Sequence, residues 1–209
     1  MSDDLDTVKR SAAKPEGYHH GDLPAALIAA ATDCLRERGI DGFSLRETAR
    51  RAGVSPAAPQ HHFGDARGLL TAVATRGFHL LGDALAEADA AAGDRDARIR
   101  GQGRAYLHFA LDHPAEFDTM WRCARIDPAD AAYAQASARA FGLLAAAVAD
   151  RPFVAAQRWP DEPDPRAVAC WSLVHGLARL ALDGVFGPAE AARAGVDRLL
   201  DPVMDCLMV

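Results

Sequence analysis

Residues 44–63 read SLRETARRAGVSPAAPQHHF, and this stretch decides the fold. Its first half predicts a short helix, because Ser44 followed three residues later by Glu47 is the capping-box pattern of a helix start. Gly53 can adopt the left-handed backbone conformation that ends a helix. An apolar stripe that would face a core is formed on this helix by Leu45, Thr48, Ala49 and Ala52.

The second half of the stretch predicts another short helix after a turn of three or four residues. Ser55 is a candidate N-cap, and Pro56 suits the first helical position because its missing N–H has no partner there. Small side chains let a helix approach the base edges of DNA, and polar ones can hydrogen-bond to them. Such side chains follow at Ala57, Ala58, Gln60, His61 and His62. The outline is that of a helix-turn-helix whose second helix contacts DNA.

Composition favours an all-helical chain. Half of the 209 residues are hydrophobic, and no alternating β-branched run of useful length occurs. No apolar stretch reaches about 18 residues without a charge, and the acidic start does not resemble a signal peptide. We therefore expect a cytoplasmic protein without a membrane segment. Because CxxC spacing is absent, we predict that the cysteines are buried thiols and form neither a metal site nor disulfides, namely Cys34, Cys123, Cys170 and Cys206. We expect no cofactor.

The charge is unevenly distributed along the chain. The net charge of −6 would by itself argue against a nucleic-acid ligand. Residues 36–76, however, carry seven arginines against four acidic side chains. The acidic excess therefore lies elsewhere, chiefly toward the C-terminal part, which fits a small DNA-facing end on an acidic body.

The pattern divides the chain into three parts. Residues 1–17 are expected to form a flexible arm, either a solvated tail or an arm whose cations contact DNA. Residues 18–64 are expected to form the helix-turn-helix domain, with a first helix over residues 23–38 that Asp22 caps. The remainder, residues 65–209, is expected to form a ligand-binding and dimerisation domain, which begins with a connecting helix over residues 65–92. About nine helices are expected in all.

The last two predicted helices suggest how the chain associates. Four prolines mark residues 151–165 as a loop, and Asp164 is a candidate cap for the helix that follows. That helix, residues 165–186, is apolar on nearly all sides, so both its faces must be covered. The final helix follows Gly187 and carries one apolar stripe. We predict a homodimer in which these two helices form a four-helix bundle across the twofold axis.

These residues resemble the TetR family of transcriptional regulators. The resemblance is carried by YHHGDL at residues 18–23, GIDGFSLRETARRAGVS at 39–55 and AAPQHHFGDARGLL at 57–70. In the C-terminal half, WSLVHGLARLALDG at 171–184 is similar to the WHG subgroup of the family, through Trp171, His175 and Gly176. The resemblance implies a dimeric, all-α repressor whose recognition helices enter successive major grooves of a palindromic double-stranded DNA operator.

The resemblance also implies DNA contacts residue by residue. Positions that reach base edges or thymine methyl groups are matched by Arg46, Pro56, Ala57, Gln60 and His61, and positions that hold phosphates by Ser44, Ser55 and His62. Two residues depart from the family pattern: Gln60 replaces the usual tyrosine, and Ala66 replaces the usual lysine. Each departure removes one backbone contact and flattens the salt dependence of binding, although a glutamine can read adenine.

Several residues allow two interpretations. We interpret Arg46 as a DNA contact, whereas at least one of Arg50 and Arg51 is interpreted as part of a solvated helix face. His175 suits either a hydrogen-bonded core position or a ligand cavity, and Gly176 suits close helix packing. The cavity interpretation predicts an effector site that binds a small, mostly apolar molecule, lined by Tyr106, Phe109, Phe117, Met120, Trp121, Phe141, Trp171 and His175.

The hypothesis is therefore a ligand-responsive repressor that binds its operator as a homodimer and is released by the effector. A rival hypothesis, motivated by Gln60 and Ala66, is a small-molecule binding protein of the same fold with weak or lost operator binding. A second rival is an all-helical enzyme. The chain carries no nucleophile elbow, no Gly-rich phosphate loop and no HExxH motif, so we expect neither catalytic residues nor a metal site.

Overall fold

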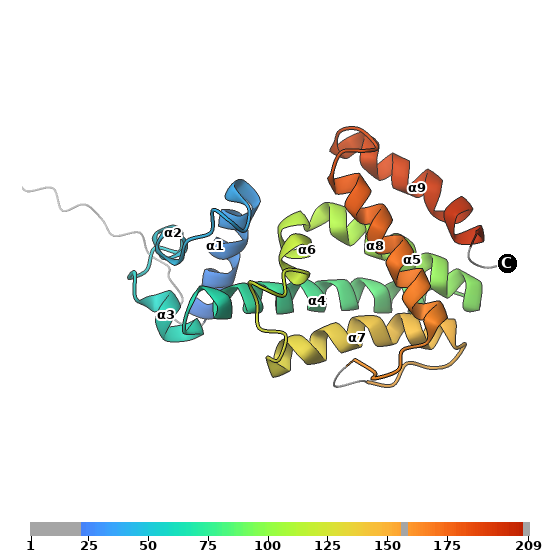
Figure 1. Ribbon diagram of the computed structural model, residues 1–209, viewed down its shortest axis with the longest axis horizontal. Coiled ribbons are helices and arrows are strands. Elements are labelled where there is room, and N and C mark those ends of the chain that lie inside the picture. Colours follow the sequence, from blue (N-terminus) through green and yellow to red (C-terminus); the bar gives the residue numbers. More distant parts are fainter. Residues whose placement is uncertain (1–21, 156–158, 207–209) are drawn as a thin grey trace, which may run out of the picture.

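The computed structural model describes residues 22–155 and 159–206, and within these ranges the protein is all-helical (Figure 1). The arm predicted for residues 1–17 and the motif residues Tyr18, His19 and His20 lie outside the described residues. No helix in the described part is long and apolar enough to cross a membrane. The described ranges contain nine helices: α1 (Leu23–Arg38), α2 (Leu45–Arg51), α3 (Ala58–Phe63), α4 (Ala66–Ala90), α5 (Arg95–Asp112), α6 (Pro114–Met120), α7 (Ala131–Val148), α8 (Pro165–Leu182) and α9 (Ala189–Asp205).

The predicted helix starts are largely confirmed by their caps. Asp22, Asp65 and Asp164 each accept a backbone N–H at the start of α1, α4 and α8. Such caps satisfy donors that have no partner inside the helix, which is why they are recognisable from sequence. The bounds differ by a few residues at some ends. For example, the connecting helix ends at Ala90 rather than at about residue 92.

The turn between α2 and α3 is longer than predicted. Gly53 has a φ of 68° and ends α2 as expected, with its N–H bonded to Arg50 O and the N–H of Val54 bonded to Ala49 O. The predicted start of the next helix at Pro56 is wrong. Ser55 O instead accepts the N–H of Ala58 across a β-turn, and α3 begins at Ala58. Pro56 occupies the turn position that its fixed φ favours.

The predicted capping box is not formed. Ser44 is the N-cap of α2, with an extended backbone, but its side chain makes no capping hydrogen bond. Glu47 bonds instead to the guanidinium groups of Arg50 and Arg51. Charge-assisted hydrogen bonds are stronger than neutral ones, so the carboxylate is drawn away from the backbone of Ser44.

The prediction that all cysteines are buried is wrong for two of them. All four are free thiols, and Cys34 and Cys170 are buried. Cys123 and Cys206 are exposed. Cys123 lies in the turn after α6 and Cys206 at the C-terminal end of α9, so neither occupies a helix face that packs on the core.

Helix α4 is the central element of the fold. Its 25 residues extend from the helix-turn-helix into the C-terminal helices, where α5, α6 and α7 pack on it (Figure 1). Residues buried along it include Leu69, Val73, Phe78 and Leu81, which belong to the main hydrophobic core. At Gly77 the helix approaches α6 so closely that a Cβ atom would lie 2.6 Å from Sδ of Met120. A larger residue at this crossing would therefore force the side chain of Met120 to shift.

Replacing Gly77 by alanine is expected to lower the free energy of unfolding by about 1–3 kcal/mol, because the added methyl group overpacks the α4–α6 contact. The matched control is Gly101→Ala in α5, where the nearest atom to the added Cβ is 3.5 Å away. Alanine should stabilise that helix by about 0.5–1 kcal/mol. Urea denaturation of both variants checks the expectation, and equal effects would contradict it.

Candidate functional site

The residues predicted to contact bases lie on an exposed surface of the helix-turn-helix. Gln60, His61 and His62 project from α3, and the turn before it carries the remaining positions. All of the following are exposed: Ser55, Pro56, Ala57, Gln60, His61 and His62. Pro59 is buried, and Phe63 packs against both hydrophobic clusters, so the opposite side of α3 faces the protein. The segment is therefore anchored on one side and accessible on the other.

Arg46 lies beside this segment on α2. Its side chain is exposed, and no ion pair or hydrogen bond holds that side chain within residues 22–155 and 159–206. Together with Ser44, which is half-buried, and Pro56, it lines a shallow hollow of about 480 Å³ between α2 and the turn before α3. A guanidinium group in this position is free to form a bidentate contact.

The two other arginines of α2 are engaged within the protein. Arg50 donates to both carboxylate oxygens of Glu47, at 2.8 and 2.9 Å. Arg51 donates to Glu47 at 2.9 Å and also binds Glu37 of α1. The hydrogen bonds from Arg50 and then Arg51 lower the pKa of Glu47 to about 2, so this carboxylate stays ionised at neutral pH. Arg51 thereby links α2 to α1 and helps to hold the helix-turn-helix together.

The start of α4 lacks a cation directed toward α3. Ala66, where the family usually has lysine, is exposed as the first residue of the helix. Arg67 is directed elsewhere: its Nε donates to the carbonyl oxygen of Ile126 at 2.8 Å, and Asp127 lies 3.7 Å from its Nη2. The structure therefore places α4 beside α3 without the side chain that would bind a phosphate there.

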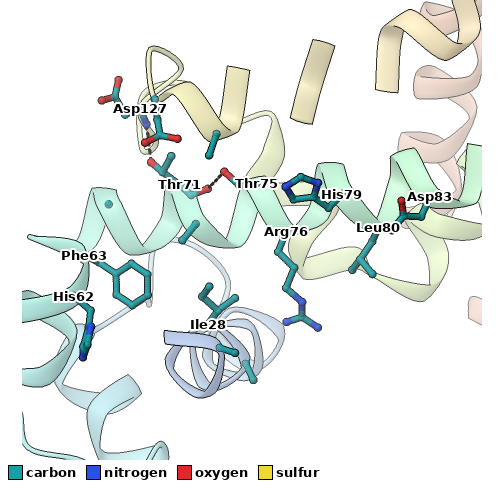
Figure 2. Close-up of a pocket in the computed structure, with 16 residues that line it drawn as sticks. Ile28, His62, Phe63, Thr71, Thr75, Arg76, His79, Leu80, Asp83 and Asp127 are labelled. Atoms are coloured by element: carbon teal, nitrogen blue, oxygen red, sulfur yellow. Dashed lines mark hydrogen bonds between the residues drawn. The ribbon is translucent and has the colours of Figure 1, made fainter. Parts of the chain in front are cut away.

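A groove of about 880 Å³ lies where the helix-turn-helix joins the C-terminal helices (Figure 2). Figure 2 shows α4 crossing this groove, with Ile28 of α1 on one side and Asp127 on the other. Arg76 points from α4 toward α1, where its Nη1 lies 3.5 Å from Oγ1 of Thr32. On the opposite side, Oγ1 of Thr71 accepts the backbone N–H of Asp127 at 2.8 Å. The groove thus marks the joint between the two parts of the molecule.

Most of the aromatic residues predicted for the effector site form one cluster in the C-terminal helices. Tyr106 and Trp121 share three ring neighbours. These neighbours are Phe117, Trp171 and His175. Phe141 joins through Trp171, with ring centroids 5.7 Å apart. The structure places Phe109 outside this cluster, beside His113. Met120 is buried in the same hydrophobic core, and its side chain lies beside Gly77 of α4.

A cavity of about 220 Å³ opens between α6 and α8 at one side of this cluster. Three of the predicted residues line it, together with three charged residues that were not predicted; the full lining is Phe117, Asp118, Trp121, Arg122, His175 and Arg179. Tyr106 and Trp171 instead adjoin a void of about 10 Å³ deeper in the core. The missed residues carried a signal in the sequence, because Arg179 lies four positions after His175 and therefore on the same helix face.

His175 is held by a buried tyrosine. Its Nδ1 lies 2.9 Å from the hydroxyl oxygen of Tyr106. Burial raises the pKa of Tyr106, so the phenol keeps its proton, and burial, assisted by Arg179, lowers the pKa of His175. The imidazole is therefore neutral at pH 7.

The outer face of α8 is uncovered in the single chain. Val168 and Leu180 are exposed there, and Leu199 of α9 is also exposed. A Cβ atom on Gly176 would meet nothing within 4 Å, so this glycine does not serve close packing inside the single chain. The face combines apolar side chains with a position that leaves room for a second helix.

Comparison with known proteins agrees with this geometry. Residues 27–73 match the model of the bacterial regulatory proteins of the tetR family, and residues 99–203 match that of the tetracyclin repressor-like C-terminal domain. A 51-residue segment is 45% identical to the class A tetracycline repressor protein from transposon 1721 of Escherichia coli. That segment spans about a quarter of either chain.

Solved structures share the fold over nearly the whole chain. A protein of unknown function from Rhodococcus sp. RHA1 is 32% identical, with a TM-score of 0.67 over 90% of this chain and 98% of the other. The TetR-family transcriptional regulator PfmR from Thermus thermophilus is 23% identical and shares the fold, with a TM-score of 0.59 over 84% of this chain and 97% of the other.

An exposed recognition helix on an all-helical scaffold defines a DNA-binding protein of the helix-turn-helix class. Because the C-terminal family model matches half of the chain and the N-terminal model matches the helix-turn-helix, this protein belongs to the TetR family of regulators. It is a DNA-binding transcriptional regulator and not an enzyme. Among the described residues, no group of three or more His, Cys, Asp or Glu side chains is placed to hold a metal ion.

Introducing lysine at Ala66 is expected to strengthen binding to the promoter fragment upstream of the protein's own gene, because it adds one phosphate contact. The plot of log K against log salt concentration should become steeper by about 0.9 for each DNA-bound chain. Titrations at several salt concentrations measure this slope. Ala66→Gln, which adds length without charge, is the control, and an unchanged slope for Ala66→Lys would place residue 66 away from the DNA.

Proposed function

We propose that the protein represses transcription by binding a palindromic operator as a homodimer, and that a small effector bound in the C-terminal helices releases it. The observation that carries the proposal is the exposure of the whole segment from Ser55 to His62, except its anchor at Pro59 and the half-buried Ala58, beside the unpaired Arg46. In this interpretation Arg46, Pro56, Ala57, Gln60 and His61 face the bases, while Ser44, Ser55 and His62 hold phosphates. Such a regulator acts on chromosomal DNA, so we also propose a cytoplasmic location.

Helix α6 supplies the connection between the effector cavity and the helix-turn-helix. One side of α6 lines the cavity with Phe117, and its other side carries Glu116, which is buried 3.9 Å from the guanidinium of Arg76. The loop after α6 is attached to the turn before α2, where Arg125 binds the side chain of Asp41 and the carbonyl oxygen of Ile40 at 3.0 and 3.1 Å. A ligand that displaces α6 therefore pulls on α1 and on the turn that positions α2.

The effector must bind better to the arrangement that cannot engage DNA. A 100-fold preference for that arrangement would supply about 2.7 kcal/mol toward release. The aromatic cluster supports the assignment of the C-terminal domain to the WHG subgroup, since Trp171 and His175 of that motif both belong to it. We propose that the cluster, with the cavity beside it, forms the effector site.

The outer faces of α8 and α9 support a homodimer through the last two helices. Exposed apolar side chains at Val168, Leu180 and Leu199 leave a surface that a second copy of the chain would cover. Dimerisation is needed for the proposed function, because two recognition helices must lie about 34–36 Å apart to enter successive major grooves.

Replacing Arg46 by alanine is expected to weaken operator binding by about 1–3 kcal/mol and to relax specificity at one base pair. The wild-type chain and the variant are titrated against the upstream promoter fragment at two salt concentrations. Arg151→Ala, an exposed arginine in the loop after α7, is the control and should bind normally. Unchanged affinity and specificity for Arg46→Ala would remove this residue from the interface.

The same titration tests the rival hypothesis of a binding protein that has lost its operator, which the departures at Gln60 and Ala66 favour. Binding by the wild-type chain with a steep salt dependence and a sequence preference supports the regulator. No detectable binding at low salt supports the rival.

Replacing Leu180 by glutamate is expected to give monomers, because an unpaired charge buried within the predicted four-helix bundle is costly. Sedimentation velocity measures the change, and operator binding should be lost with it. The control is Val154→Glu, which changes an exposed valine in the loop after α7. A dimer that survives Leu180→Glu would exclude this face as the interface.

A further inference from the structure

The cavity between α6 and α8 has flat aromatic walls and a small volume. The ring of Phe117 is stacked on the imidazole of His175, with centroids 5.3 Å apart, and Trp121 meets the same imidazole edge-on at 4.8 Å. The volume of about 220 Å³ is below the range of about 300–1,000 Å³ typical of sites for drug-sized ligands. A ligand of this site is therefore small and planar, about the size of one aromatic ring.

One charged residue of the cavity has no partner of opposite charge in the described part of the chain. Arg179 is neutralised, because its guanidinium binds Asp118 across the cavity wall and Asp183 one turn further along α8. Asp118 is the acidic residue of the lining, and Arg179 engages its carboxylate. The side chain of Arg122 is exposed and has no hydrogen bond or ion pair with any residue that the structure describes. The cavity thus offers one unpaired guanidinium and no unpaired carboxylate.

The neutral polar groups of the cavity are donors as well. The hydroxyl group of Tyr106 is buried and its one recorded partner is Nδ1 of His175, so the phenol must donate its proton to that nitrogen. The neutral imidazole then carries its own proton on Nε2, which has no acceptor among the described residues. The indole N–H of Trp121 is likewise buried without a partner in the described part of the chain. The N–H groups of His175 and Trp121 therefore lack a hydrogen-bond acceptor in the described part of the chain.

We propose that the effector is a small aromatic carboxylate, whose ring lies against the partly exposed rings of Trp121 and His175 and whose carboxylate binds Arg122. The inference rests on the proposed function, because it names the chemical class that the effector site selects. A guanidinium group pairs with a carboxylate through two parallel hydrogen bonds, and the donors of His175 and Trp121 complete its partners. A cationic ligand would face Arg122 with the same charge, and a neutral hydrocarbon would leave every donor unpaired.

Three single-ring probes that differ in one substituent test the proposal: benzoate, toluene and benzylamine. Each is titrated against the full-length protein, and binding is followed by calorimetry and by the fluorescence of tryptophan. Benzoate is expected to bind at least tenfold more tightly than either of the others. Equal affinity of the three probes, tighter binding of benzylamine, or no binding of benzoate at millimolar concentration would overturn the proposal.

Two substitutions place the binding within the cavity. Arg122→Ala is expected to weaken benzoate binding by about tenfold or more, as for the loss of a hydrogen-bonded charge. Trp121→Phe, which keeps an aromatic ring but removes the N–H and part of the ring surface, is expected to weaken it several-fold. Arg151→Ala is the control for loss of a positive charge. If Arg122→Ala leaves the benzoate affinity as unchanged as Arg151→Ala does, the carboxylate binds elsewhere. That result would overturn the assignment of Arg122 as its partner.

The promoter titration of the same preparations separates this inference from the proposed function. If operator binding depends on Arg46 but benzoate does not bind, the proposed regulatory function is supported. The proposal that the effector is an aromatic carboxylate is then refuted. Binding of benzoate that depends on Arg122, without operator binding, supports the ligand class and refutes the repressor. Release of the promoter fragment by benzoate in the wild-type protein but not in Arg122→Ala supports both.

Discussion

The close approach of α6 to α4 at Gly77 is the constraint on which the rest of the structure depends. Helix α4 belongs to both parts of the molecule: α3 and α1 pack near its start, and α5, α6 and α7 pack along the remainder. Because the side chain of Met120 fills the space beside Gly77, α6 packs tightly against α4. The residues of α6 that face away from α4 line the cavity, and Arg125 beyond its end holds the turn before α2. These contacts connect the cavity to the helix-turn-helix.

Much of the fold could be predicted because it is encoded locally. Asp22, Asp65 and Asp164 cap their helices through side chains that reach only two or three residues along the chain, and Gly53 ends α2 by its own backbone conformation. The errors arose where tertiary partners compete with local ones. Glu47 binds Arg50 and Arg51 and not the backbone of Ser44, and Arg51 also binds Glu37 of α1. Pro56 suits a turn as well as a helix start, and sequence alone does not choose between them.

The candidate sites illustrate the same limit. Periodicity identifies Phe109 and Met120 as apolar and inward-facing, but it does not say which neighbour each one meets, so the proposed effector list includes residues that lie outside the aromatic cluster. The exposure of α3 was easier to predict, since small and polar residues on a short helix have no core to join. Arg50 pairs with Glu47 within α2, and Arg51 pairs with Glu47 and with Glu37 of α1. Arg46 is therefore the cation of α2 that is available to a ligand.

The alanine at position 66 has a consequence for the rate at which the protein would dissociate from DNA. A phosphate contact chiefly prolongs the residence of a protein on DNA, because related complexes differ in dissociation rate far more than in association rate. A regulator that lacks one such contact in each subunit leaves its operator sooner. In the proposed mechanism, the occupancy of the operator would then follow the effector concentration with little delay.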